Sequence, residues 1–261
     1  MWGRPSPGRA EMPFLDHLEE LRARLIWSLL AVGIGAVVGF ALVNRFDLLG
    51  LLIRPIDAYL PSGKLLFLSP TEPFFITLKL GVAVGVLLAS PFVAHQFWAF
   101  VSPALHPHER RAIVPIFALG LVLFLGGVAL AYFVTLPITV QFMMSFQVES
   151  LEPSLVIGEY LSFAVKLLLA FGLVFELPVV LLLLAAVGLV NSKMLTEKRR
   201  YAIVFMVIGA SLITPADVAS TLILMGPMLL LYELGIGLVR MVERRRAKRE
   251  VESDRYWVSA T

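Results

Sequence analysis

The side chains that could do chemistry in this 261-residue chain are a few carboxylates among long apolar runs. Glu176 lies near the middle of one run, roughly 163–190, and Pro178 follows two residues later. An ionised carboxyl in hydrocarbon costs on the order of 2.5–3.5 kcal/mol on insertion scales. Pro178 removes a backbone donor, so the carbonyl of Val174 loses its helical partner. Both defects require water or a protein partner, and they predict a buried polar notch at Glu176. A protonated, helix-packed glutamate beside a tolerated proline kink is the alternative.

Three further carboxylates lie in polar segments outside the apolar runs. Glu20 and Glu109 belong to two separate segments, and Asp217 lies in a tight turn at residues 214–217. Two carboxylates beside a membrane cavity suit a ligand with paired guanidinium groups, because Arg–carboxylate pairing is planar and often bidentate.

The motifs of several enzyme classes are missing from the sequence. With no Cys, thiol catalysis, disulfides and Cys-ligated zinc are excluded. Neither a GxxxxGK[ST] phosphate loop nor a GxSxG elbow is present. His106, His108 and Glu109 lack the HExxH spacing of a zinc site. We therefore expect no enzyme activity, no cofactor, no metal and no nucleic-acid partner, and we expect the basic tail to meet anionic membrane lipid.

The composition excludes a soluble globule, since 59% of the residues are hydrophobic and the mean hydropathy is +0.86. We predict an all-α polytopic membrane protein with six transmembrane helices. The predicted spans are about 25–43, 74–97, 112–136, 163–190, 201–213 and 222–239. They form one membrane domain, 1–240, followed by a basic cytoplasmic tail, 241–261. The fifth run is only about 20 Å long as a helix, so spans five and six could instead form a re-entrant hairpin.

The distribution of positive charge predicts the orientation. Seventeen of the 22 Lys and Arg residues fall on one side, with four before the first span, two after the second, four after the fourth and seven after the sixth. Three fall on the other side, and two lie within spans. Because cytoplasmic loops carry the excess of Lys and Arg, both termini are predicted to lie in the cytoplasm.

Two segments outside the spans have their own patterns. Residues 12–24 place leucines on one helical stripe and charges opposite, which predicts an amphipathic helix leading into the first span, with Glu20 and Arg24 as an i,i+4 pair. The loop 44–73 holds four prolines and two apolar pieces, 48–53 and 65–68, which we interpret as short helices.

A series of short motifs in order resembles the TatC family, the multispanning subunit of the twin-arginine protein translocase. Each motif is weak alone, and together they are specific. They are His17-Leu18-Glu19-Glu20-Leu21-Arg22-Ala23-Arg24, Ser90-Pro91, Gln96 to Leu105, His108-Glu109-Arg110-Arg111, Ala131-Tyr132-Phe133 with Pro137, Phe171-Gly172 with Phe175-Glu176-Leu177-Pro178, Arg199-Arg200-Tyr201, Thr214-Pro215 with Asp217, and Pro227 with Leu231-Tyr232-Glu233.

The resemblance implies six spans in a cupped, glove-like receptor of the bacterial cytoplasmic (inner) membrane. Such a receptor binds twin-arginine signal peptides of folded precursors and nucleates a proton-gradient-driven complex with single-span TatA- and TatB-like subunits, with self-association. It also implies roles for particular residues. Those implied in signal-peptide recognition are Glu20, Arg22, Phe100 and Glu109, the buried family glutamate is Glu176, and the outer-face and cap positions are Pro55 and Asp217. Ala216 departs from the family, which usually has a second proline there.

A proton-coupled small-solute transporter is the competing interpretation, with Glu176 as its proton site. Such transporters often show internal repeats. No repeat relates residues 1–130 to 131–261, and the short fifth span would give poor walls to a sealed solute path.

Overall fold

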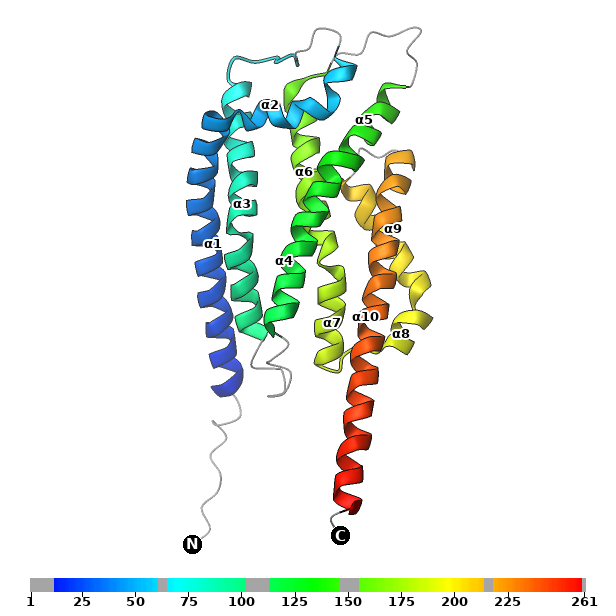
Figure 1. Cartoon of the computed structure of the whole chain (residues 1–261). Helices are drawn as coiled ribbons and strands as arrows, with labels where there is room; N and C mark the ends of the chain where they lie inside the picture. Colours follow the sequence, from blue (N-terminus) through cyan, green and yellow to red (C-terminus); the bar gives the residue numbers. More distant parts are fainter. Residues whose placement is uncertain (1–11, 61–64, 102–112, 146–154, 214–217, 260–261) are drawn as a thin grey trace. The chain divides into compact units, whose positions relative to one another are not determined.

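The computed structural model describes residues 12–60, 65–101, 113–145, 155–213 and 218–259, and it is helical almost throughout (Figure 1). Five helical stretches are long and apolar enough to cross a membrane: Asp16–Phe46, Glu72–Phe100, Pro115–Met144, Ile157–Ala186 and Thr221–Arg244. The predicted all-α membrane fold is therefore confirmed. The fifth predicted span corresponds to helix α9 (Arg199–Ile213), whose 15 residues fall short of that length, so the sixth crossing stays a prediction.

The chain folds into two compact units, one of residues 1–48 and 77–117 and the other of residues 49–76 and 118–261. The single membrane domain 1–240 and the tail 241–261 stay predictions. Helix α10 (Val218–Ser259) runs without a break across the boundary at residue 240.

The first unit is built on α1 (Met12–Phe46) and α3 (Glu72–Val101), which lie side by side and antiparallel (Figure 1). The predicted lead-in helix and the first span form the single helix α1. Glycines bring the two helices close together. A Cβ built on Gly35 would lie 2.6 Å from the carbonyl oxygen of Gly85, and one built on Gly39 would collide with the carbonyl oxygen of Gly81. Small residues at such crossings allow two backbones to touch.

The second unit holds the remaining helices, which include two deviations from regular α-helix. Its elements are α2 (Leu48–Ile53), the 3₁₀ helix η2 (Arg54–Tyr59), α4 (Ile113–Leu130) from residue 118 onward, the π-helical turn η5 (Ala131–Thr135), α5 (Leu136–Met144), α6 (Ile157–Phe175), α7 (Leu177–Ala186), α8 (Ser192–Glu197), α9 and α10. Two helical stretches have other bounds than the spans predicted for them, whose limits in the membrane stay predictions. The helix of the third continues beyond residue 136 to Met144, and that of the fourth is interrupted at Glu176, just before Pro178.

The loop that follows α1 is partly helical, as predicted. Residues 48–53 form α2, which confirms the first short helix. The second, at 65–68, is wrong, because Leu66 pairs in parallel with Val156 as an isolated β-bridge. The Leu66 N–H donates to Leu155 (3.1 Å) and its carbonyl accepts from Ile157 (2.8 Å), so the partners of its main chain lie far away in the sequence.

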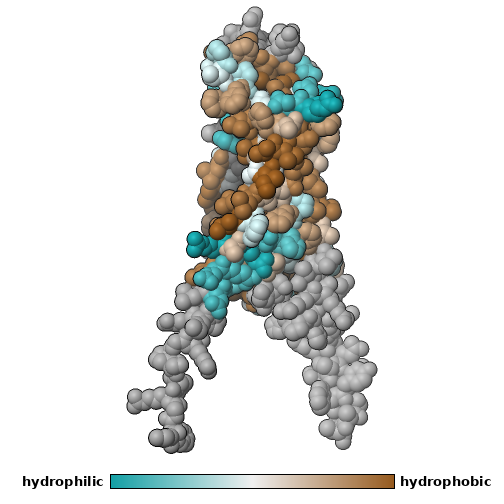
Figure 2. All heavy atoms as spheres, turned by 90° about the vertical axis from the view of Figure 1, so that its left-hand side faces the viewer, coloured by the Kyte–Doolittle hydropathy of each residue, from teal (hydrophilic) through white to brown (hydrophobic). Residues whose placement is uncertain are grey.

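Figure 2 shows one face of the molecule, where hydrophobic side chains form a band with hydrophilic residues at both ends. This distribution suits a protein whose middle lies in hydrocarbon and whose ends meet water and lipid head groups.

The glycine contacts between α1 and α3 predict an asymmetric response to added methyl groups. Gly85→Ala places a Cβ against the backbone of Ala36, whereas a Cβ at Gly33 meets nothing within 4 Å. We expect Gly85→Ala to destabilise the protein by about 1–3 kcal/mol, as overpacking does. Gly33→Ala, the matched control, should be neutral or stabilising, because alanine favours helix over glycine. Thermal unfolding in detergent measures both, and equal shifts would contradict close packing at Gly85.

Candidate functional site

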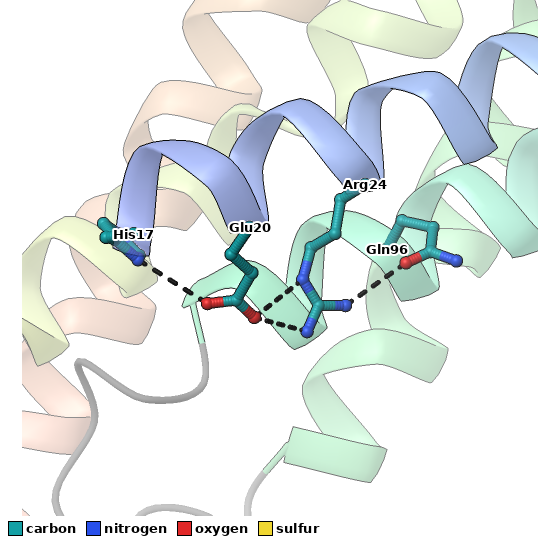
Figure 3. A network of polar contacts seen from close by, with 4 residues as sticks. All are labelled: His17, Glu20, Arg24 and Gln96. Atoms are coloured by element: carbon teal, nitrogen blue, oxygen red, sulfur yellow. Dashed lines mark hydrogen bonds and ion pairs between the residues drawn. The ribbon is translucent and has the colours of Figure 1, made fainter. Parts of the chain in front are cut away.

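The predicted recognition residue Glu20 lies in a polar cluster on one face of α1, together with His17 and Arg24 (Figure 3). The guanidinium of Arg24 donates twice to Oε1 of Glu20, from Nε at 2.9 Å and from Nη2 at 2.6 Å. This confirms the predicted i,i+4 pair. The second oxygen, Oε2, faces Nδ1 of His17 at 3.7 Å.

Helix α3 completes the cluster from the other side. Nη1 of Arg24 donates to Oε1 of Gln96 at 3.2 Å, as Figure 3 shows. The ring of His17 stacks on that of Phe100, with centroids 4.3 Å apart and planes at 8°. Two of the predicted recognition residues, Glu20 and Phe100, are thus brought together through His17. The antiparallel glycine packing of α1 on α3 sets this register.

The other predicted recognition residues are placed differently. Arg22 is two residues from Glu20, or about 200° around the helix. It is exposed and does not join the cluster. Glu109 lies outside the described residues, as does the outer-turn residue Asp217.

The cluster has the chemistry that a planar cation requires. The Glu20 side chain keeps 33% of its surface exposed, so a ligand can reach it. It already holds a guanidinium in a charge-assisted geometry, which is the strong kind of hydrogen bond. Among the described residues, no group of three or more His, Cys, Asp or Glu side chains is placed to hold a metal ion.

Glu176 lies at the break between α6 and α7. Its N–H donates to the carbonyl of Leu173 at 3.1 Å, three residues back instead of four, and is also directed at Val174. The carbonyl that Pro178 was predicted to orphan therefore has a nearby donor. The side chain is half-buried, and no described residue donates a hydrogen bond to its carboxylate.

Glycines determine what packs around Glu176. Its carboxylate lies over Gly120 of α4, with Oε2 3.0 Å from a Cβ built there. The space over Gly172 is filled by the ring of Phe124 from α4, which lies 2.7 Å from a Cβ built on that glycine. The carboxylate of Glu176 thus packs against the backbone of Gly120, a residue that has no side chain. This packing is consistent with the predicted polar notch.

Pro55 occupies the start of η2, in a segment that two tyrosine hydroxyls fix to the span helices. Tyr132 donates to the carbonyl of Leu51 (2.6 Å) and Tyr160 to that of Leu52 (2.7 Å). These two anchors were not predicted from the sequence. The sequence feature that could have indicated them is a tyrosine inside an apolar run, because a buried hydroxyl usually requires a hydrogen-bond partner.

Glu72 is a second residue that the sequence reasoning missed. Its Oε1 accepts from the N–H of Gly158 at 3.0 Å, in the first turn of α6, and its Oε2 accepts from the N–H of Leu68 at 2.7 Å. A carboxylate at a helix N-terminus satisfies a free donor and meets the positive end of the helix dipole. Glu72 therefore joins the loop after α2 to the start of α6.

Two of the motifs that resemble the TatC family meet in space. Arg199 Nη2 binds Glu233 Oε2 at 2.7 Å, and the hydroxyl of Tyr232 donates to the carbonyl of Leu195 at 2.9 Å. The short helix α8 and the start of α9 are thereby fixed to α10.

Comparison with known proteins gives concordant results over most of the chain. Residues 16–227 match the family described as Sec-independent protein translocase protein (TatC). The TatC proteins of Desulforapulum autotrophicum and Aquifex aeolicus are each 39% identical, over 242 and 244 residues; both matches cover 92% of this chain, with 89% and 99% of the respective relative. A crystal structure described as that of the twin arginine translocase receptor TatC matches with a TM-score of 0.78 and 39% identity, covering 86% of this chain and 98% of the other.

The two tyrosine anchors lead to a prediction on stability. Tyr160 is 4% exposed, whereas Tyr132 is less buried. Tyr160→Phe leaves the Leu52 carbonyl without its donor, so we expect a loss of about 1–3 kcal/mol. Tyr132→Phe should have a smaller effect, because water or lipid head groups can replace the hydroxyl. Thermal unfolding of both variants measures this, and a larger effect at Tyr132 would contradict it.

Proposed function

Because the chain belongs to the TatC family, and so is a multi-pass membrane component of a protein translocase and no enzyme, we propose that it is the subunit that receives twin-arginine signal peptides of folded precursors. The observation that carries the proposal is the Glu20–Arg24 pair, a carboxylate that already binds a guanidinium and keeps a third of its surface exposed. A related solved structure is described as a twin arginine translocase receptor. Family membership decides against a small-solute transporter.

In the proposed mechanism, a signal-peptide arginine takes the place of Arg24 at Glu20. Arg24 can leave without becoming unpaired, because its Nη1 already donates to Gln96. The stacked rings of His17 and Phe100 form a flat wall beside the carboxylate, suited to the aliphatic part or the plane of a guanidinium. Glu109 would bind the second arginine, and Arg22 would contact the peptide from another face of α1.

The remaining residues have proposed roles in assembly. Glu176 forms the notch that receives the polar end of a single-span TatA- or TatB-like subunit or an inserting signal peptide. Pro55 and Asp217 support the outer face, where copies of the protein associate in a larger complex that uses the proton gradient. With 17 of 22 basic residues on one side, both termini are proposed to lie in the cytoplasm of a bacterial inner membrane.

Removal of either recognition carboxylate should weaken peptide binding. Losing one partner of a charge-assisted hydrogen bond costs roughly 1.5–3 kcal/mol, so Glu20→Ala and Glu109→Ala should each raise the Kd for a twin-arginine peptide by about tenfold or more. The double variant should bind more weakly than either. Titration of a labelled peptide into the purified protein measures this. Glu19→Ala, at an exposed neighbouring carboxylate, is the matched control, and unchanged affinity in both single variants would refute the proposal.

Arg24→Gln, measured by the same peptide titration, tests whether a peptide arginine replaces Arg24 at Glu20. The variant removes the internal occupant of Glu20, so peptide affinity should rise several-fold, within the ~1 kcal/mol that partly exposed ion pairs contribute. A loss of affinity as large as that of Glu20→Ala would show instead that Arg24 holds Glu20 in position.

Variants of Glu176 should separate transport from recognition. Glu176→Gln keeps the hydrogen-bonding atoms and should impair transport less than Glu176→Ala or Glu176→Leu, which remove the polar group from the notch. Peptide affinity at the α1–α3 cluster should be unchanged in all three. Transport assays on membrane vesicles, with the peptide titration beside them, test this. Normal transport by Glu176→Leu would mean that the notch has no role.

A further inference from the structure

A pocket of about 380 Å³ lies in the second unit, between α5, α6 and α9, and Glu176 is not among the residues that line it. Most of its wall is apolar and belongs to membrane-spanning helices. Its lining includes Met143 and Met144 of α5, Glu159, Phe163 and Lys166 of α6, and Leu212 of α9. Methionine and leucine side chains form an adaptable wall that suits a flexible hydrocarbon chain.

Two opposite charges line this pocket at different depths along α6. Glu159 lies in the first turn of the helix. Lys166 is seven residues further, which is the same helical face and about 10 Å deeper along the axis. Both side chains are exposed. Neither makes a hydrogen bond or ion pair with any residue that the structure describes.

An unpaired Lys inside a span is costly, so its ammonium is expected to reach towards the head-group region and find an anion. The nearest abundant anion at that depth is a lipid phosphate. Glu159, closer to the end of the helix and therefore to water, is placed for a cation that lies further out than the phosphate. On the protein, the positive charge of Lys166 therefore lies nearer the hydrocarbon, and the negative charge of Glu159 lies nearer water.

We propose that this pocket binds a phospholipid with a zwitterionic, primary-amine head group of the phosphatidylethanolamine class. Lys166 pairs with its phosphate, Glu159 accepts hydrogen bonds from its ammonium, and an acyl chain lies against Met143, Phe163 and Leu212. A head group with phosphate nearer the hydrocarbon and ammonium nearer water is the complement of the protein's charge order. Phosphatidylglycerol lacks the cation, and a choline head group has no N–H to donate.

Native mass spectrometry of the full-length protein in detergent tests the site, with titration by phosphatidylethanolamine, phosphatidylcholine and phosphatidylglycerol of identical acyl chains. The wild type should bind phosphatidylethanolamine several-fold more tightly than the other two. Lys166→Gln should weaken binding of all three lipids several-fold, because all carry the phosphate. Glu159→Gln should remove only the preference for phosphatidylethanolamine.

Exchanging the two charged residues tests whether the lipid preference depends on the positions of the charges or only on the net charge. The double variant Glu159→Lys with Lys166→Glu keeps the net charge, and it should lose the preference for phosphatidylethanolamine. Lys193→Gln, at an exposed lysine of α8, is the control and should leave lipid binding unchanged. Both exchanged side chains are exposed, and unaltered thermal unfolding of each variant confirms that it is folded. Equal binding of the three lipids by the wild type, or a preference that survives the charge exchange, would overturn the proposal.

Discussion

Every main-chain N–H and C=O inside a bilayer has to find its partner within the protein, and the places where helices stop are where this constraint decides the structure. Around the loop after α2, side chains supply the partners for several of these main-chain groups. Tyr160 supplies a donor to Leu52, and Glu72 supplies acceptors to Gly158 and Leu68. The polar atoms of this loop are therefore what holds the short, irregular helices onto the long ones.

The distance along the chain between interacting residues separates what the sequence could predict from what it could not. Hydropathy and local spacing predicted the all-α membrane fold, the helix at 48–53 and the pairing of Glu20 with Arg24, because each depends on neighbours within a few residues. The bond from Arg24 to Gln96 joins residues 72 apart, and the bond from Gly158 to Glu72 spans 86. Such pairs depend on which helices pack together, and no local pattern contains that information. Leu66 was misassigned for this reason.

The candidate site depends on packing that lies well away from it. Gly35 and Gly85 let the backbones of α1 and α3 touch in the apolar part of the helices. Because the helices are antiparallel, that contact sets the register about three turns further along, where Arg24 meets Gln96, and about four to five turns along, where the rings of His17 and Phe100 stack. Glycines inside the membrane thereby determine the geometry of a polar site at its edge.

The pairing of Glu20 with the protein's own Arg24 also bears on selectivity. When one guanidinium replaces another on the same carboxylate, bonds are broken as well as formed, so the exchange yields less net free energy than binding to an unoccupied carboxylate would. A peptide with a single arginine would therefore bind less tightly than it would to a free Glu20. A second arginine, bound elsewhere without displacing an internal partner, would supply the surplus. In the proposed receptor, the occupied carboxylate acts as a threshold that isolated basic residues on unrelated proteins do not cross.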